Sequence, residues 1–190
     1  MIPNLGNFSL WLAFCFAVLQ FVVSYQKNNK STLYLNRIAV NGLLLCAFLS
    51  FLSLMYSYLV SDFSVVNVFQ NSHTTKPLLY KIAAVWGNHE GSMLLWILVL
   101  AIFNYFIFKL YNKTNSIFIS KTLETQAFVT IGFLLFTLLT SNPFERIIPV
   151  PTNGLGFNPI LQDPALAIHP PLLYIGYVGF SAAFSFSISA

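Results

Sequence analysis

The chain has 190 residues, of which 57% are hydrophobic and only 7% are charged. Because a soluble domain carries about 25% charged residues, this composition excludes a soluble globular protein and predicts an integral membrane protein. The formal net charge of +4 does not indicate nucleic acid binding, since basic residues spread over loops are explained by membrane topology.

Five stretches are long and apolar enough to cross a bilayer, which takes about 20 mostly apolar residues. They lie near residues 5–25, 38–60, 92–110, 125–141 and 171–190. The first is not a cleavable signal peptide, because it lacks a basic start and no small-residue cleavage site follows it. We therefore predict an all-α integral membrane fold. It is a polytopic bundle of about five transmembrane helices that form one transmembrane domain over 1–190.

The charges of the connecting loops predict the orientation of the bundle. Six of the nine basic residues lie in 26–37 and 109–124, whereas four of the five acidic residues lie in 61–91 and 142–170. The basic loops are expected on the cytoplasmic or matrix side of the membrane. The N-terminus is then outside, in the periplasm or intermembrane space, together with both long loops.

Both long outer loops are expected to be ordered. The apolar residues of 77–86 share one helical face: Leu78, Leu79, Ile82 and Trp86. They predict a short helix in the outer membrane interface. The second loop, 142–171, holds seven of the nine prolines and an Asn153-Gly154 turn signal. Since proline restricts the backbone, this loop is expected to follow a defined path over the bundle.

The first candidate site is the segment WGNHEGS, residues 86–92. Asn88 or Ser92 suits a helix cap, and Glu90 suits the positive end of the helix dipole. This structural interpretation does not account for His89. A neighbouring acid and histidine at a membrane surface could also relay protons or hold the polar edge of a cofactor, and both interpretations stay open.

The second candidate is His169, which directly precedes Pro170 and Pro171. A residue before proline is disfavoured in the helical region, and proline suits the first turn of a helix. The sequence therefore predicts an extended His169 on a stiff elbow at the outer end of the last span. An imidazole above an apolar, aromatic helix suits axial ligation of a haem. The residues alone favour the alternative, an interfacial histidine bonded to a loop carbonyl.

Three stretches resemble one known family: MIPNLGNFSLWLAF, AVWGNHEGSMLLW and GFNPILQDPALAIHPPLLYIGYVGFSAAFSF. They are similar to the N-terminal part of the CcmF family, the membrane component of the cytochrome c maturation haem lyase of bacteria and some mitochondria. The resemblance runs from Met1 to Ala190. It implies a multi-pass protein of the bacterial or mitochondrial inner membrane that takes part in cytochrome c-type biogenesis.

The resemblance also implies a cofactor and partners. The cofactor is a membrane haem b, with His169 as one axial ligand of its iron. Trp86, His89 and Glu90 are further candidates for cofactor contact, without a defined role. The implied partners are the haem chaperone and other maturation subunits, apocytochrome c, the remaining C-terminal part of the lyase, and the lipid membrane, but no nucleic acid.

The chain departs from the family pattern in two ways. The tryptophan-rich WWD signature is absent, and no histidine follows His169, so the second axial ligand and the other haem-handling histidines are missing. We therefore expect a fragment or split-gene product that is inactive alone. The alternative is a membrane scaffold or assembly subunit without a cofactor. An ion-translocating subunit is disfavoured, because the spans carry no Asp, Glu, Lys or Arg at mid-membrane depth.

Overall fold

The computed structural model describes residues 1–26, 30–114, 117–156 and 163–190. Within these residues the chain forms seven helices: α1 (Ile2–Tyr25), α2 (Lys30–Leu59), α3 (Val66–Asn71), α4 (Leu78–Ala84), α5 (His89–Thr114), α6 (Ile117–Thr140) and α7 (Pro164–Ser189). Strand-like pairing in the described part is limited to one isolated bridge, between Val65 and Arg146. The predicted all-α fold is confirmed.

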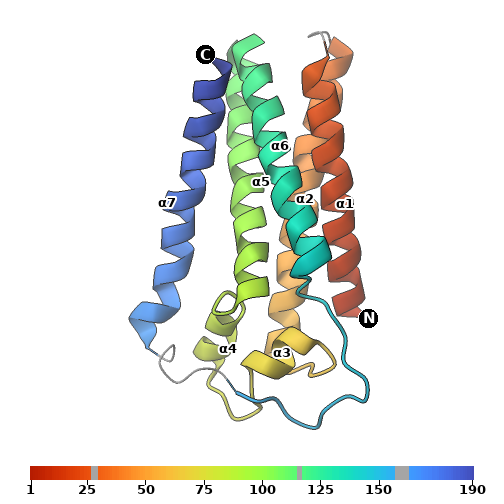
Figure 1. Cartoon of the computed structure of the whole chain (residues 1–190), viewed down its shortest axis with the longest axis vertical. Helices are drawn as coiled ribbons and strands as arrows, with labels where there is room; N and C mark the ends of the chain where they lie inside the picture. The colour runs from red at the N-terminus through yellow and green to blue at the C-terminus, as the bar shows by residue number, and fades with distance from the viewer. Residues whose placement is uncertain (27–29, 115–116, 157–162) are drawn as a thin grey trace.

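Five of the described helices are long and apolar enough to cross a membrane, namely α1, α2, α5, α6 and α7. They run side by side, and α3, α4 and the long loops cover one end of the bundle (Figure 1). The N-terminus lies at that covered end and the C-terminus at the other. The polytopic bundle is thus confirmed, whereas which side of the membrane each end faces stays a prediction.

The helices extend beyond the predicted spans. α2 begins at Lys30 instead of residue 38, and α6 begins at Ile117 instead of residue 125. Hydropathy locates only the part of a helix suited to lipid, and polar residues with adequate helix propensity continue the same helix into water. Lys27 of the predicted basic loop lies outside the described residues, whereas Arg37 belongs to α2.

The two long loops pack on each other at the covered end. The Val66 N–H donates to the Glu145 carbonyl at 2.9 Å, and the Ile147 N–H donates to the Ser64 carbonyl at 3.0 Å. Arg146 adds an ion pair with Asp62, with 3.7 Å between nitrogen and oxygen. The described part of the second loop therefore follows the defined path that its prolines predict; residues 157–162 lie outside the described part.

The Asn153-Gly154 pair holds the second loop close to α3. The Asn153 Oδ1 atom accepts the Thr74 N–H at 3.2 Å and the Gly154 N–H at 2.9 Å. A Cβ atom on Gly154 would collide with the Ser72 carbonyl oxygen and lie 2.8 Å from the Phe63 ring. Glycine is required here because the loop backbone approaches α3 so closely.

Buried amide side chains connect the spans inside the bundle. Gln20 of α1 donates to Asn104 Oδ1 of α5 at 2.6 Å, and Asn104 donates to Thr130 Oγ1 of α6 at 3.0 Å. An unpaired polar group at this depth would be costly, since the hydrocarbon offers it no partner. These bonds align three spans. The hydrophobicity of the stretches, from which the spans were predicted, does not reveal them.

Candidate functional site

Helix α7 begins earlier than the sequence predicts. It starts at Pro164, and Asp163 Oδ1 accepts the Ala165 N–H at 2.8 Å. Pro164 therefore takes the first-turn position, and Pro170 lies inside the helix. The predicted extended elbow at His169 is wrong, because His169 lies in the second turn of α7.

A distant side chain replaces one of the two backbone hydrogen bonds that the double proline removes from the helix. Pro171 has no N–H to donate to the carbonyl of Ala167, four residues earlier. That carbonyl accepts the indole N–H of Trp86 at 2.8 Å instead. Of the predicted site residues, Trp86 is thus the one that the structure ties to the helix of His169.

The exposed His169 side chain lies above an apolar surface of the same helix. Residues spaced by three and four positions line a hollow of about 410 Å³ on α7: Leu172, Leu173, Gly176, Tyr177 and Phe180. The space beside Gly176 is open, with no other side chain within 4 Å of a Cβ atom built there. His169 continues this face by one more turn toward the covered end of the bundle.

This surface fits one side of a haem. Among the described residues, no group forms a hydrogen bond with the His169 ring, so its nitrogens remain available to a metal. The hollow is lined by leucine and aromatic side chains, which suit contact with an apolar macrocycle. Phe180 is 70% exposed, so the opposite side of such a site must come from outside this helix.

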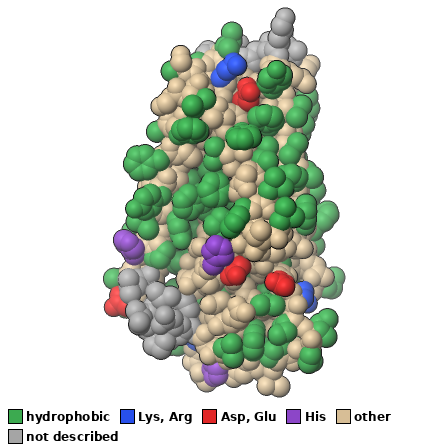
Figure 2. Space-filling model, in the orientation of Figure 1, with side chains coloured by type: hydrophobic (Ala, Val, Ile, Leu, Met, Phe, Trp, Pro, Cys, Tyr) green, Lys and Arg blue, Asp and Glu red, His purple; other side chains and the backbone are tan. Residues whose placement is uncertain are grey.

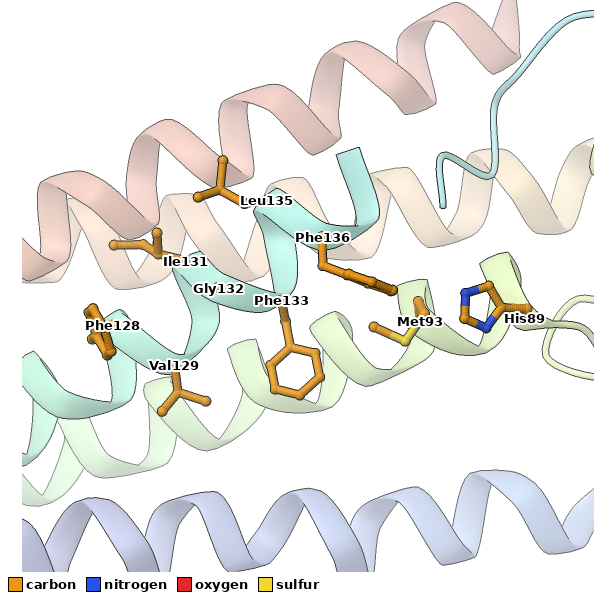
Figure 3. A pocket seen from close by; sticks show the side chains of 9 residues that line it. All are labelled: His89, Met93, Phe128, Val129, Ile131, Gly132, Phe133, Leu135 and Phe136. Atoms are coloured by element: carbon orange, nitrogen blue, oxygen red, sulfur yellow. The ribbon is translucent and has the colours of Figure 1, made fainter. Parts of the chain in front are cut away.

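His89 faces a different helix. It is the first residue of α5, and its Nε2 atom shares a hydrogen bond of 2.9 Å with Ser141 Oγ at the end of α6. Its ring meets Phe136 edge to face, with 6.1 Å between centroids. Figure 3 shows His89 at one end of an apolar groove of about 750 Å³ along α5 and α6; the other lining residues are Met93, Phe128, Val129, Ile131, Gly132, Phe133, Leu135 and Phe136.

Glu90 bonds to α3, although it follows His89 directly. Its Oε2 atom accepts a hydrogen bond of 3.0 Å from Asn67 of α3. Asn88 Oδ1 accepts the Gly91 N–H at 2.8 Å, so Asn88 caps α5, and Glu90 lies in the first turn as expected. The structure therefore places His89 and Glu90 against different helices, and the contacts of Asn88 and the position of Glu90 match the capping interpretation.

A buried polar cluster beneath the WGNHEGS segment was not predicted from the sequence. Tyr58 OH donates to Asn67 Oδ1 at 2.5 Å and accepts from Asn88 Nδ2 at 3.0 Å. Asn67 also donates to Asn88 Oδ1 at 2.7 Å. The three residues come from separate segments and form no motif, so only the fold brings them together. They fix the turn between α4 and α5 that carries Trp86 and His89.

The candidate residues lie near the covered end of the bundle. The histidine side chains visible in Figure 2 all lie in its lower half, toward the end that carries α3 and α4 in Figure 1. His169 lies in the second turn of α7. Both observations place the candidate residues toward the covered end of the bundle.

Comparisons with known proteins agree with this arrangement. The family model described as "Cytochrome C assembly protein" matches residues 86–190, from Trp86 through α7. The cytochrome c-type biogenesis protein CycK of Rhizobium meliloti is 47% identical over 193 residues, covering 100% of this chain and 29% of its own length. The cytochrome c-type biogenesis protein CcmF of Escherichia coli is 40% identical over 194 residues, covering 100% of this chain and 30% of its own length.

A solved structure agrees as well. The structure titled "Cytochrome c Heme Lyase CcmF" superposes with a TM-score of 0.83 at 26% sequence identity. The superposition covers 100% of this chain and 30% of the chain of the solved structure. The chain thus spans about 30% of the length of the relatives it matches.

Proposed function

Because this chain belongs to the cytochrome c assembly protein family, we propose that it forms part of a haem lyase that attaches haem covalently to apocytochrome c. The support is its similarity, over its full length, to cytochrome c-type biogenesis proteins and to a solved haem lyase. Since the chain spans only about 30% of those proteins, the reaction needs the remaining part of the lyase. Alone, the chain is inactive in this proposal.

The role proposed for this chain is to hold haem through His169. The observation that carries it is an exposed imidazole without a hydrogen-bond partner among the described residues, one turn above an apolar hollow. His169 would supply one ligand to the haem iron, and Leu172 and Tyr177 would contact the macrocycle. The lyase reaction joins haem vinyl groups to cysteine thiols of apocytochrome c, and the residues of this chain position the haem for that step.

The position of His169 bears on which haem it holds. The family resemblance implies a haem b resident in the membrane. His169, however, lies in the second turn of α7, toward the covered end of the bundle. A haem ligated there lies at the membrane surface, where a haem chaperone and apocytochrome c have access. This geometry favours the haem in transit over a haem b at mid-membrane depth.

The proposed setting rests on the charges of the loops and on the family resemblance. The protein lies in the bacterial or mitochondrial inner membrane, with the covered end outside. Its partners are the remaining C-terminal part of the lyase, the haem chaperone and apocytochrome c. In this proposal the second ligand of the haem iron comes from one of these partners.

Replacing His169 by alanine tests the ligand role. The chain is co-expressed with the remaining part of the lyase, and the purified complex is examined for its Soret absorption. We expect the haem content of the variant complex to be lower than that of the wild type by a factor of about ten or more. Without this ligand, haem would be held only by apolar contacts. Added imidazole should restore part of the absorption.

His73→Ala is the matched control, because His73 Nδ1 bonds only locally, to Thr75 Oγ1 at 2.8 Å. It should leave the spectrum unchanged. An unchanged spectrum in the His169 variant would exclude His169 as a ligand. A wild-type complex that carries no haem at all would favour a membrane scaffold or assembly subunit.

A further inference from the structure

We propose that Trp86 is a positioning residue for His169. Its indole N–H replaces the backbone hydrogen bond that Pro171 cannot make, and thereby keeps α7 helical through the His-Pro-Pro stretch. The inference rests on the proposed ligand role of His169. The effect of Trp86 on the backbone of α7, however, can be measured without haem.

The hydrogen bonds of this turn account for the contact. In an α-helix each carbonyl accepts from the N–H four residues later, so Pro171 leaves the Ala167 carbonyl without its partner. Ala167 is only 3% exposed, which limits replacement of the missing bond by solvent. The Trp86 Nε1 atom lies 2.8 Å from the Ala167 oxygen, a normal N–H to oxygen distance.

Without this bond, local preferences favour a different backbone. The residue before a proline prefers an extended conformation, and proline prefers the first turn of a helix. The helix would then begin at Pro170, and His169 would be extended. The observed α7 instead begins at Pro164 and includes His169. The imidazole projects in different directions in these two states, so the Trp86 bond selects the direction in which the ligand points.

Trp86 is suited to this role because its own backbone is fixed. The Gly87 N–H donates to the Ala83 carbonyl at 3.0 Å, continuing α4 by a turn. Asn88 Nδ2 donates to the Ala84 carbonyl at 2.6 Å and is anchored to Tyr58. The indole therefore projects from a rigid turn toward α7, across 81 residues of sequence.

The first test compares two tryptophan-to-phenylalanine variants in the chain co-expressed with the remaining part of the lyase. Trp86→Phe keeps an aromatic ring and removes the N–H. Trp96→Phe is the matched control, because its buried Nε1 atom has no hydrogen-bond partner among the described residues. In Trp86→Phe, amide hydrogen exchange over residues 167–173 should be about fivefold faster, and haem retention should fall by a similar factor. Trp96→Phe should change neither.

The decisive test adds Pro171→Ala, which returns an N–H to position 171. In this background the helix can bond the Ala167 carbonyl itself, so Trp86→Phe should have little further effect on exchange or on haem retention. An equal loss in both backgrounds would show that Trp86 acts through packing and overturn the inference. So would wild-type exchange in Trp86→Phe alone.

If the proposed function is wrong, the experiments give a different set of results. If His169→Ala leaves the haem spectrum unchanged, His169 is not a ligand, and the positioning role falls with it. The exchange measurements then still report whether Trp86 holds the start of α7. If His169→Ala removes the spectrum while Trp86→Phe changes neither exchange nor haem retention, only the inference about Trp86 is overturned.

Discussion

A Gly91→Ala variant is expected to disrupt the turn between α4 and α5 and to lower the stability of the whole bundle. A Cβ atom on Gly91 would overlap the Val85 carbonyl oxygen and lie 2.8 Å from the Val85 carbonyl carbon. These are backbone atoms, which cannot rotate away as a side chain can. Relieving the overlap must therefore move the turn that carries Trp86 and Asn88, at a cost of about 3 kcal/mol.

Thermal unfolding of the purified chain in detergent measures this cost, with Gly132→Ala as the matched control. Gly132 is also helical, but a Cβ atom there has nothing within 4 Å. Both substitutions gain the higher helix propensity of alanine, worth about 1 kcal/mol, so the difference between their Tm values isolates the overlap. Gly91→Ala should unfold at a clearly lower temperature than the wild type and Gly132→Ala at the same or a higher one. Equal Tm values for the two variants would contradict the prediction.

The number and kind of the membrane elements are predictable from the sequence, whereas their ends are not. Apolar stretches of sufficient length identify all five spans, because the cost of exposing polar groups to lipid is a local property of the chain. The start of α7 is not local. The backbone preferences of His169 and Pro170 place the start of α7 at Pro170. A hydrogen bond from Trp86, 81 residues away, allows the helix to begin at Pro164.

In the candidate site, too, the sequence identifies the residues but does not reveal their contacts. The sequence identifies Trp86, His89 and His169 as chemically notable, but it does not show what each one contacts. Successive residues of a helix project roughly 100° apart. His89 therefore reaches Ser141 while Glu90 reaches Asn67, and an acid-histidine pair read from adjacency does not form one unit.

The polar contacts between spans are equally hidden from hydropathy, and two of them join α7 to α6. Only 11% of the apolar window of α7 is buried, against 39% or more in the other four spans. Gln126 of α6 donates to Ser181 Oγ at 2.9 Å and accepts from Ser185 Oγ at 2.7 Å. Because few residues of α7 are buried, we expect these two bonds to contribute to the attachment of α7 to α6, and with it to the position of His169.

Replacing Gln126 by leucine should therefore loosen α7 without unfolding the other spans. Gln126 is fully buried, and loss of both bonds should weaken the attachment of α7 by about 1–2 kcal/mol. Spin labels attached to cysteines at the exposed positions Tyr34 of α2 and Ser187 of α7 report the effect. Pulsed electron paramagnetic resonance should show a broader distribution of the distance between them. Haem retention in the assembled lyase should fall in parallel.

Thr125→Val is the control for this experiment, because Thr125 neighbours Gln126 but its hydroxyl donates only within α6, to the Lys121 carbonyl at 3.1 Å. Its distance distribution should match the wild type. A Gln126→Leu, Ser185→Ala double variant should be no looser than Gln126→Leu alone, since the bond that Ser185 makes to Gln126 is already lost. A distribution as narrow in Gln126→Leu as in the wild type would show that other contacts hold α7, and that the buried amide contributes nothing to placing His169.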